Sequence, residues 1–333
     1  MQAFIVDRYA KDAALRLGDV PRPNVGDRDV LVEVHAAALN LLDSKIRTGE
    51  FKLILPYRPP FVAGHDVAGV VTRVGAKVSN FKVGDEVYAR PRDGRIGAFA
   101  EYIAIDEADV ALKPKNLTME EAAAVPLVGL TAWQALVEMA NLKKGQKVFI
   151  QAGSGGVGTF AIQLAKHLGA TVATTTSAKN TELVQNLGAD IVIDYRSEDF
   201  EGVLSDYDVV LNSQDTKTLE KSLRVLKPGG FAISISGPPD PAFAKRLGLN
   251  PLLKLILRLL SSGIRKQAKR AGVRYSFLFM VGSGTQLAKI TRLIESGAIR
   301  PIIDRVFPFA QTNQALAYVE QGRARGKVVI KLK

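Results

Sequence analysis

Hydrophobic positions occur in short runs through the first hundred residues. Five of these runs are rich in β-branched or aromatic residues, and Gly, Pro, Asn and Asp separate them. They are MQAFIV (1–6), DVLVEVHAAAL (29–39), VAGVVTRVG (67–75), DEVYAR (85–90) and FAEYIAI (99–105). Such runs between turn-forming residues are typical of strands. Their close spacing predicts a barrel-like or sandwich-like β-rich unit.

The pattern changes after Pro114. Residues 118–142 have the apolar period of a helix, and Thr118 with Glu121 matches a capping box at its start. Strand-like and helix-like segments then alternate: 147–153, 155–170, 171–177, 180–189, 190–195, 207–213, 218–230 and 231–237. This alternation predicts βαβ units and a parallel sheet.

The last third of the chain is less regular at first. Residues 240–274 are strongly basic, and 285–297 form a helical pattern that Gly297 ends. A strand-like segment (301–309), a helical one (311–324) and a final strand (327–333) follow. The order of elements is therefore a β-rich unit, an α/β unit and a tail that is free to return to the first unit.

Composition narrows the class of protein. At about 150 residues per domain, 333 residues correspond to about two domains. Hydrophobic residues make up 47% and charged residues 23%, which excludes a disordered or collagen-like chain. The absence of cysteine excludes disulfides, thiolate zinc sites, iron–sulfur clusters and a cysteine nucleophile. Three histidines (His35, His65 and His167) argue against a multi-histidine metal site.

Charge is the unusual feature. Lys and Arg number 45 against 33 Asp and Glu, a net charge of +12, which suggests nucleic acid, a membrane surface or an anionic small molecule as partner. Residues 241–294 contain eleven of the basic residues and no acidic one, so the remainder has 34 basic against 33 acidic residues. The N-terminus lacks the apolar segment of a signal peptide, and no run reaches the roughly 20 apolar residues of a spanning helix. We expect a soluble, cytoplasmic protein.

The strongest chemical pattern is a glycine-rich turn. Gly153, Gly155 and Gly158 fit G-x-G-x-x-G between a buried strand (148–150) and a helix, with Ser154, Gly156 and Val157 completing the turn. Glycine lets the backbone approach a pyrophosphate, and the amides of the following helix face the anion. Glycines also pack helices on sheets, but this context predicts a dinucleotide-binding site.

The strand after the turn indicates which dinucleotide. NAD-specific folds usually end this strand with Asp or Glu, and no carboxylate occurs between Ala170 and Asn180. Ser177 and Lys179 stand where a 2′-phosphate would lie, and a hydroxyl and an ammonium suit a phosphate. We therefore expect NADPH rather than NADH. The alternative is a solvated loop with a chance lysine.

Together these segments resemble the medium-chain dehydrogenase/reductases, specifically the zinc-free quinone oxidoreductase and enone (alkenal) reductase branch. The resemblance covers nearly the whole chain, through ALNLLDSKIRTG (38–49), FVAGHDVAGVVTRVG (61–75), FKVGDEVYA (81–89), PLVGLTAWQAL (126–136), AGSGGVG (152–158), LGADIVIDY (187–195), LKPGG (226–230) and RARGKVVI (323–330). It implies an α/β protein with a GroES-like domain (1–121 and 295–333). A Rossmann domain with a doubly wound parallel sheet (122–294) would carry the basic insert at about 240–280. The active site would lie in the cleft, and the protein would be a homodimer.

The departures from zinc-dependent relatives are informative. Those relatives carry a Cys near Asn40, a His–Glu pair near His65 and Asp66, and a four-Cys lobe after residue 90. Here Asn40 replaces the Cys and the lobe is missing. One histidine without a thiolate partner cannot hold zinc. We expect a zinc-independent protein in which His65 is structural.

The resemblance also suggests catalytic residues. The nicotinamide supplies the hydride, and the protein orients it and polarises the acceptor carbonyl. Asn40 is a candidate to bind substrate or nicotinamide, and Asp43 and Lys45 to stabilise an enolate-like oxygen or position the ribose. Tyr57 is a candidate proton donor or stacking group. Because some quinone reductases carry Tyr near position 45 and enone reductases tend to carry Lys, Lys45 favours reduction of an activated C=C bond. The alternative is a solvated lysine.

Further cofactor contacts are implied in the same way. Thr131 would lie near the nicotinamide and phosphates, and Tyr195 by the adenosine phosphate. Asn212 and Ser213 would lie where the chain passes the adenine. Lys327 would reach the cofactor across the cleft, or else be a surface residue.

The basic insert allows three interpretations. It is a lid or subunit interface, a basic amphipathic helix on an anionic membrane, or a folded insert with a solvated basic face. Lys254, Arg258, Arg265 and Lys269 share one helical face, and Gly263 is expected to interrupt the helix, which favours the first interpretation. Nucleic acid ranks last, because no recognition motif accompanies the charge.

The sequence thus predicts an NADPH-dependent oxidoreductase that transfers hydride to a quinone or to the activated C=C of an α,β-unsaturated carbonyl. The alternative is a non-catalytic NADPH-binding or peripheral membrane protein with the same fold.

Overall fold

A computed structural model describes all residues, 1–333, and divides the chain into two compact units. Unit 1 comprises Met1–Leu130 and Val281–Lys333, and unit 2 comprises Thr131–Met280. The boundaries lie at 130/131 and 280/281, whereas the sequence suggested 121/122 and 294/295. The difference arises because helix α10 (Gly284–Glu295) packs on unit 1, where the Tyr88 hydroxyl donates to the Leu287 carbonyl at 2.8 Å.

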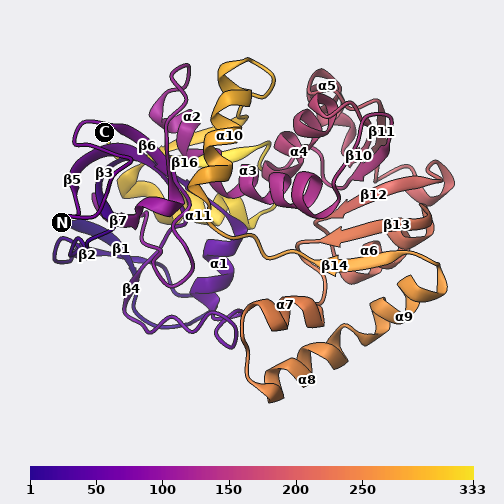
Figure 1. Ribbon diagram of the computed structural model, residues 1–333, viewed down its shortest axis with the longest axis horizontal. Coiled ribbons are helices and arrows are strands. Elements are labelled where there is room, and N and C mark those ends of the chain that lie inside the picture. Colours follow the sequence, from indigo (N-terminus) through magenta and orange to yellow (C-terminus); the bar gives the residue numbers. More distant parts are fainter. The chain divides into compact units, whose positions relative to one another are not determined.

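Unit 1 is built on two sheets (Figure 1). The larger has the order β15-β16-β3-β5-β6-β8, and β7 pairs with β3. Its strands are β3 (Asp29–Leu39), β5 (Asp66–Val74), β6 (Glu86–Ala89), β7 (Tyr102–Asp106), β8 (Val110–Leu112), β15 (Ile303–Pro308) and β16 (Lys327–Lys331). The smaller sheet joins β2 (Arg16–Asp19), β1 (Gln2–Val6) and β4 (Phe61–Val62). The β-rich first unit predicted from the apolar runs is confirmed.

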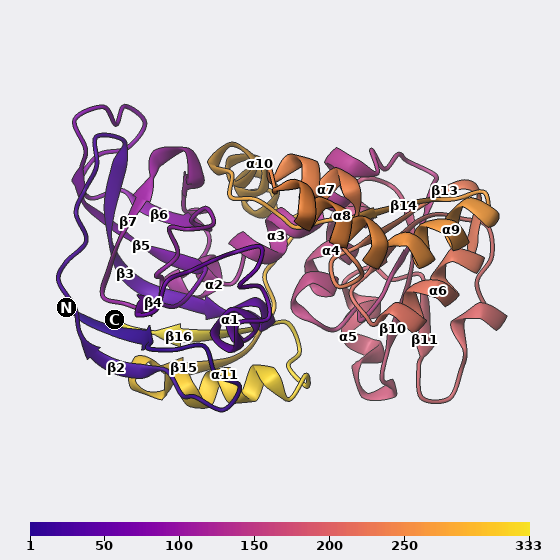
Figure 2. The ribbon, with the colours of Figure 1, turned by 90° about the horizontal axis from the view of Figure 1, so that it is seen from below.

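The C-terminal tail returns to this unit. Strand β16 runs antiparallel to β3, with Val328 opposite Leu39, and β15 runs parallel to β16. Helix α11 (Thr312–Glu320) packs on β16 and beside α1 (Leu41–Thr48), as Figure 2 shows. The two ends of the chain are therefore held in one unit.

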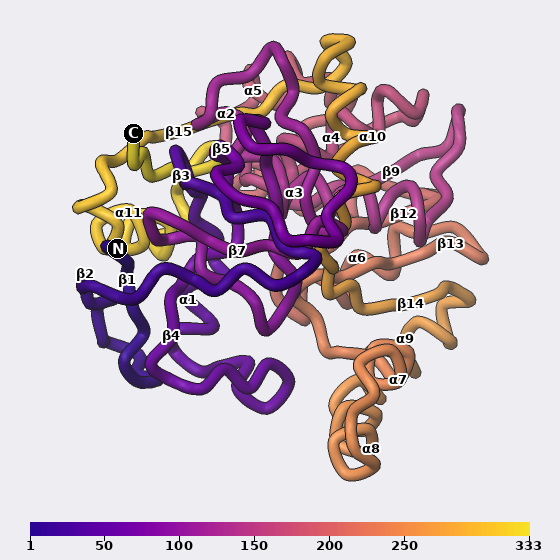
Figure 3. Tube along the Cα trace, turned by 60° about the vertical axis from the view of Figure 1, so that its left-hand side comes forward, coloured from indigo at the N-terminus to yellow at the C-terminus, as the bar shows by residue number.

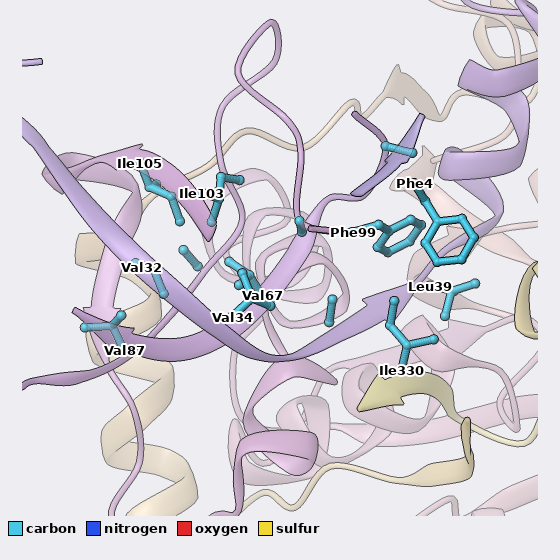
Figure 4. Close-up of a cluster of buried hydrophobic side chains, with 14 of the residues drawn as sticks. Phe4, Val32, Val34, Leu39, Val67, Val87, Phe99, Ile103, Ile105 and Ile330 are labelled. Atoms are coloured by element: carbon cyan, nitrogen blue, oxygen red, sulfur yellow. The ribbon is translucent and has the colours of Figure 1, made fainter. Parts of the chain in front are cut away.

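Alternation along the strands builds the core of unit 1. Val30, Val32 and Val34 lie on one face of β3, because successive side chains of a strand point to opposite faces. They pack in one buried cluster with Phe4, Phe99 and others, drawn in Figure 4.

The helical segment predicted for 118–142 is divided into three pieces. Helix α2 (Met119–Ala123) begins with the predicted capping box: Thr118 Oγ1 accepts from the Glu121 amide, and a Glu121 carboxylate oxygen accepts from the Thr118 amide. Helix α3 (Pro126–Trp133) and a π-helical stretch (Gln134–Met139) follow. The division falls at Pro126, which has no amide hydrogen to continue the first helix.

Unit 2 contains a six-stranded sheet in which all strands are parallel. Its order is β11-β10-β9-β12-β13-β14. The strands are β9 (Lys147–Ile150), β10 (Thr171–Thr176), β11 (Ile191–Asp194), β12 (Tyr207–Asn212), β13 (Leu226–Ser234) and β14 (Arg274–Phe277). This is the doubly wound Rossmann order, in which ligands bind at the carboxyl ends of the strands where the order reverses, here at β9 and β12. The predicted parallel sheet is confirmed.

Helices cover both faces of this sheet (Figure 1). Helices α4 (Gly156–His167) and α5 (Thr181–Asn186) follow β9 and β10, and α6 (Thr216–Arg224) follows β12. The connection from β13 to β14 contains three helices: α7 (Pro241–Arg246), α8 (Pro251–Leu260) and α9 (Ser262–Arg270). The basic insert is broken at Ser261, between α8 and α9. The break was expected at Gly263, which instead lies in the first turn of α9. None of the helices combines the length and hydropathy needed to cross a membrane.

Candidate functional site

The turn between β9 and α4 is tightly packed at its glycines. Gly155 is the N-cap residue of α4 and has an extended backbone, with no side chain capping the helix. A Cβ on Gly153 would lie 2.1 Å from Thr174 Oγ1, and one on Gly158 would lie 2.3 Å from the Ala152 carbonyl oxygen. A side chain at Gly153 or Gly158 would therefore collide with β10 or with the turn itself, and the first amides of α4 have no acceptor within the helix. These residues fit the pyrophosphate of a dinucleotide.

The loop after β10 is tied to this turn. The Ser154 hydroxyl accepts from Thr176 Oγ1 at 2.9 Å and from Asn180 Nδ2 at 3.1 Å. Asn180 Nδ2 also lies 3.3 Å from Ser177 Oγ, and Lys179 extends into solvent from the same loop. The predicted Ser177 and Lys179 thus lie at the carboxyl edge of the sheet, next to the glycine turn. Thr176 and Asn180 had not been predicted, because their roles depend on register between neighbouring strands.

Strand β11 ends beside the same loop. The Tyr195 amide donates to the Thr176 carbonyl at 3.2 Å, and the Tyr195 ring is 60% exposed. The Arg196 guanidinium lies 5.8 Å from the centre of this ring. Arg196 therefore adds a second cation at this edge, which the sequence reading missed because the family pattern points to Tyr195.

Two predicted adenine contacts lie at the end of β12. Asn212 is fully buried, where its Nδ2 donates to Gln151 Oε1 and its Oδ1 accepts from Ser234 Oγ, both at 2.6 Å. The Ser213 hydroxyl lies 3.4 Å from the Gln151 carbonyl. The Asn212 carboxamide therefore ties β12 to its neighbours β9 and β13. Thr131 is also buried, near the C-terminus of α3.

A separate polar network lies inside unit 1. Lys327 is only 4% exposed, and its Nζ lies 2.5 Å from Asn40 Oδ1, 3.0 Å from Asp66 Oδ2 and 3.0 Å from the Leu39 carbonyl. Asn40 Nδ2 donates to the same Asp66 oxygen at 2.9 Å. The other Asp66 oxygen accepts from the Leu127 amide at 2.7 Å. Lys327 thus lies inside the β-rich unit, and its ammonium group has three acceptors there.

Asp43 extends this network to His65. One Asp43 oxygen accepts from the Asn40 amide at 2.7 Å, and the other lies 2.6 Å from His65 Nδ1. A carboxylate accepts, so Nδ1 carries the proton. His65 is fully buried, and its Nε2 has no hydrogen-bond partner. Asp43 and His65 also line a small pocket with Val6, Ile46 and Phe61. Asn40 and Asp43 therefore hold the start of α1 against β5 and β16.

The other two predicted catalytic residues lie outside this network. The Lys45 side chain is 44% exposed on α1, with its Nζ 3.6 Å from a Glu50 oxygen. The Tyr57 hydroxyl accepts from the Gly94 amide at 3.1 Å, and its ring stacks on Phe61 with centres 5.2 Å apart. Burial raises the pKa of Tyr57 to about 12. The Lys45 ammonium and the Tyr57 hydroxyl can therefore each still donate a hydrogen bond.

The residues at the expected zinc position do not fit zinc. Asn40 offers an amide, His65 Nδ1 is engaged by Asp43, and the Lys327 ammonium lies against Asp66. Nowhere in the chain do three or more His, Cys, Asp or Glu side chains form a group suited to a metal ion. A buried ammonium supplies the positive charge at this position, and it would repel a metal cation.

Comparison with known proteins agrees with both units. Residues 26–115 match the family model for the alcohol dehydrogenase GroES-like domain, and residues 187–330 match that for the zinc-binding dehydrogenases. A 2-methylene-furan-3-one reductase from Solanum lycopersicum is 39% identical over 342 residues, covering 99% of this chain and 79% of that protein. A mitochondrial NAD(P)H oxidoreductase RTN4IP1 from Danio rerio is 35% identical, covering 100% of this chain and 91% of that protein.

A solved structure extends the likeness to three dimensions. The quinone oxidoreductase from Coxiella burnetii has a TM-score of 0.87 and 30% identity, covering 100% of this chain and 99% of that one. The similarity therefore runs through both units.

Proposed function

The chain belongs to the medium-chain dehydrogenase/reductase superfamily, in its quinone oxidoreductase and enone reductase branch, and we propose that it reduces a quinone or an α,β-unsaturated carbonyl with NADPH. The observation that carries this proposal is the glycine turn, where no side chain fits at Gly153 or Gly158, next to a loop with Ser177 and Lys179 and no carboxylate. A nicotinamide bound there supplies the hydride.

The preference for NADPH rests on charge. Lys179 and Arg196 lie in the loops that follow two neighbouring strands, and Ser177 adds a hydroxyl, so this edge offers cations and a donor to a 2′-phosphate. The name NAD(P)H oxidoreductase, which one relative carries, leaves the choice open. We assign Thr131, Ser154, Gly155, Gly156, Val157, Tyr195 and Ser213 to the remainder of the cofactor site. Asn212, whose carboxamide bonds to Gln151 and Ser234, takes a positioning role at the end of β12 in place of the adenine contact that the sequence suggested.

The acceptor chemistry is assigned to unit 1. A relative named for a 2-methylene-furan-3-one has an enone as substrate, and the solved neighbour is named a quinone oxidoreductase. Both classes accept a hydride at carbon and develop negative charge on a carbonyl oxygen. The Lys45 ammonium and the Tyr57 phenol are the proposed donors to that oxygen, because both remain available for a ligand.

Asn40, Asp43 and Lys327 take a different role in this proposal. Their polar atoms bond to one another and to Asp66 and His65, so they act as positioning residues for β3 and α1. This replaces the direct substrate or cofactor contact that the sequence suggested for Asn40 and Lys327. Homodimer formation and a cytoplasmic location stay predictions.

A small panel of acceptors tests the function. NADPH oxidation is followed with a benzoquinone, an alkenal and a cyclic enone, and NADPH binding is measured separately by fluorescence. We expect turnover of at least one acceptor, and a higher kcat/KM for an enone than for the quinone, because Lys45 stands where enone reductases tend to carry Lys. NADPH binding without turnover of any acceptor would instead support the non-catalytic alternative.

A further inference from the structure

Helix α8 is covered on only a small part of its apolar surface. At 100° per residue, seven aliphatic side chains form one continuous arc on this ten-residue helix. Leu257, at one end of the arc, is buried, and Leu253 beside it is half-buried. The other five are 40–66% exposed: Leu252, Leu255, Ile256, Leu259 and Leu260. A third of all the exposed large hydrophobic residues of the chain therefore lie on this one helix.

Basic residues flank this apolar face without acidic partners. Lys254 and Arg258 lie on the opposite side of α8, and Lys266, Lys269 and Arg270 are exposed on the adjoining α9. None of these five takes part in an ion pair, and residues 241–294 contain no Asp or Glu. The remainder of the chain is almost neutral. Five cations without acidic partners thus lie beside the helix that carries a third of the exposed large hydrophobic residues.

The helices on either side hold α8 firmly. Asp240 caps α7 through the Phe243 amide at 2.8 Å, and its other oxygen accepts from the Phe277 amide on β14 at 3.1 Å. On α9, Ile264 and Ala268 are buried in the core of unit 2, and Gln267 donates to Glu220 on α6 at 2.9 Å. Helix α8 packs against α7 and α9, on the side of them away from the sheet (Figure 3). The exposed face is therefore presented on a fixed support.

We propose that the exposed face of α8, with the basic residues of α8 and α9, docks this protein on an anionic lipid surface. A bilayer offers an apolar layer beneath a negatively charged surface, and this matches aliphatic side chains flanked by unpaired cations. The helix is about 15 Å long, half of what a spanning segment needs, so it lies in the plane of the interface.

Charge decides against a second copy of the chain as the occupant. A two-fold contact through the apolar face would leave the cations of α8 and α9 in both copies without partners, because residues 241–294 contain no acidic residue. An acidic protein surface would pair with the cations. It would need a separate apolar patch to bury the five exposed aliphatic side chains. The lipid surface satisfies both requirements at once.

Vesicle co-sedimentation of the full-length protein tests this proposal. Vesicles of phosphatidylcholine with 30% phosphatidylglycerol are expected to bind the protein at least about tenfold more tightly than pure phosphatidylcholine at low salt. High salt weakens this binding, because exposed charges are screened. The absence of binding to anionic vesicles at low salt would overturn the proposal.

Matched variants separate the two contributions. Leu252→Gln/Leu255→Gln/Leu259→Gln and Lys254→Gln/Arg258→Gln are each expected to weaken vesicle binding about tenfold or more. These side chains are exposed, so the variants keep their fold by circular dichroism. Controls with the same changes elsewhere, Val83→Gln/Leu112→Gln/Val306→Gln and Lys143→Gln/Arg323→Gln, are expected to bind like the wild type.

Sedimentation equilibrium tests whether a second copy of the chain occupies the exposed face of α8 instead. If sedimentation equilibrium shows that the wild type is a dimer, that the apolar triple variant is a monomer and that neither binds vesicles, α8 is a subunit interface and the proposal fails. NADPH oxidation with a water-soluble acceptor is expected to be unchanged in all variants. The lipid proposal therefore succeeds or fails independently of the enzymatic one.

Discussion

The ammonium nitrogen of Lys327 lies 3.0 Å from Oδ2 of Asp66, and both side chains are buried although 261 residues separate them. Asn40 bonds to both partners and completes a triangle between β3, β5 and β16. The pair thus joins the C-terminal tail to strand β5, which begins at Asp66. A buried charge is tolerated only with such compensation, so the three residues depend on one another.

Replacing Lys327 by Met is expected to destabilise the protein by about 3–5 kcal/mol, because it leaves the Asp66 carboxylate buried and unpaired. Urea unfolding of both proteins at pH 7 measures this difference. The exposed pair Lys77–Asp27 provides the control, and Lys77→Met is expected to cost at most about 1 kcal/mol. A similar small cost for both variants would show that the internal pair contributes no more than a surface one.

Replacing Lys179 by Ala is expected to raise the KM for NADPH about tenfold or more, since a charge-assisted bond to the 2′-phosphate is lost. The KM for NADH is expected to change less than twofold. Ser177→Ala is expected to raise the KM for NADPH by a smaller factor. Steady-state kinetics with both cofactors measures the split, and Lys217→Ala, at an exposed lysine on α6, is the control. Equal losses with both cofactors would contradict the assignment to the 2′-phosphate.

Replacing Gly153 by Ala is expected to abolish NADPH binding, because the new Cβ would lie 2.1 Å from Thr174 Oγ1. Displacement of the turn also destabilises unit 2 by about 1–3 kcal/mol. Fluorescence titration and thermal unfolding measure the two effects. Gly202→Ala, where nothing lies within 4 Å of the added carbon, is expected to bind NADPH normally. Tight binding by Gly153→Ala would exclude the turn as the phosphate site.

Replacing Lys45 by Gln is expected to lower kcat about a hundredfold while leaving the KM for NADPH unchanged, since the proposed role is to stabilise charge on the acceptor oxygen. Lys52→Gln, at an exposed lysine shortly after α1, is the matched control. A variant with normal kcat would identify Lys45 as a solvated surface lysine.

The pKa of Tyr57, raised by burial to about 12, makes stability depend on pH. The unfolded chain releases this proton near pH 10, whereas the folded protein retains it. The free energy of unfolding is therefore unaffected by this group below pH 10 and falls by about 3 kcal/mol as the pH rises from 10 towards 12. The difference in unfolding free energy between wild type and Tyr57→Phe is expected to shrink over this range.

Absorbance titration provides an independent check on Tyr57. The wild type minus Tyr57→Phe difference is expected to show one phenol ionising near pH 12, and Tyr195→Phe controls for the loss of one tyrosine from the total. Ionisation of the Tyr57 phenol near pH 10 would contradict its burial.

Local patterns predicted most of the elements and one of the two polar clusters. The β-branched runs gave strands β1, β3, β5, β6 and β7 within a few residues, because alternation is a property of neighbouring positions. The glycine turn was predicted for the same reason, since strand, turn and helix follow one another directly. Where a tertiary contact determines a boundary, prediction failed: the bonds from Tyr88 to α10 assign that helix to unit 1.

The roles of several side chains likewise depend on tertiary contacts that the sequence does not show. Lys327 was interpreted as a cofactor or surface residue, yet it is buried against Asp66 and Asn40, from strands far apart in sequence. Thr176 and Asn180 support the glycine turn only because β9 and β10 pair in one particular register. Helix α8 shows the reverse case, because its apolar arc is visible in the sequence but its exposure is not.

The sequence by itself determined the two kinds of unit, the place of the glycine-rich turn and the concentration of charge in one insert, since each depends on residues adjacent along the chain. Only the tertiary structure decided that a lysine lies at the expected metal position, which side chains complete the turn and which face of α8 is uncovered. These features depend on contacts between segments up to 261 residues apart, and burial and pairing are properties of the folded chain.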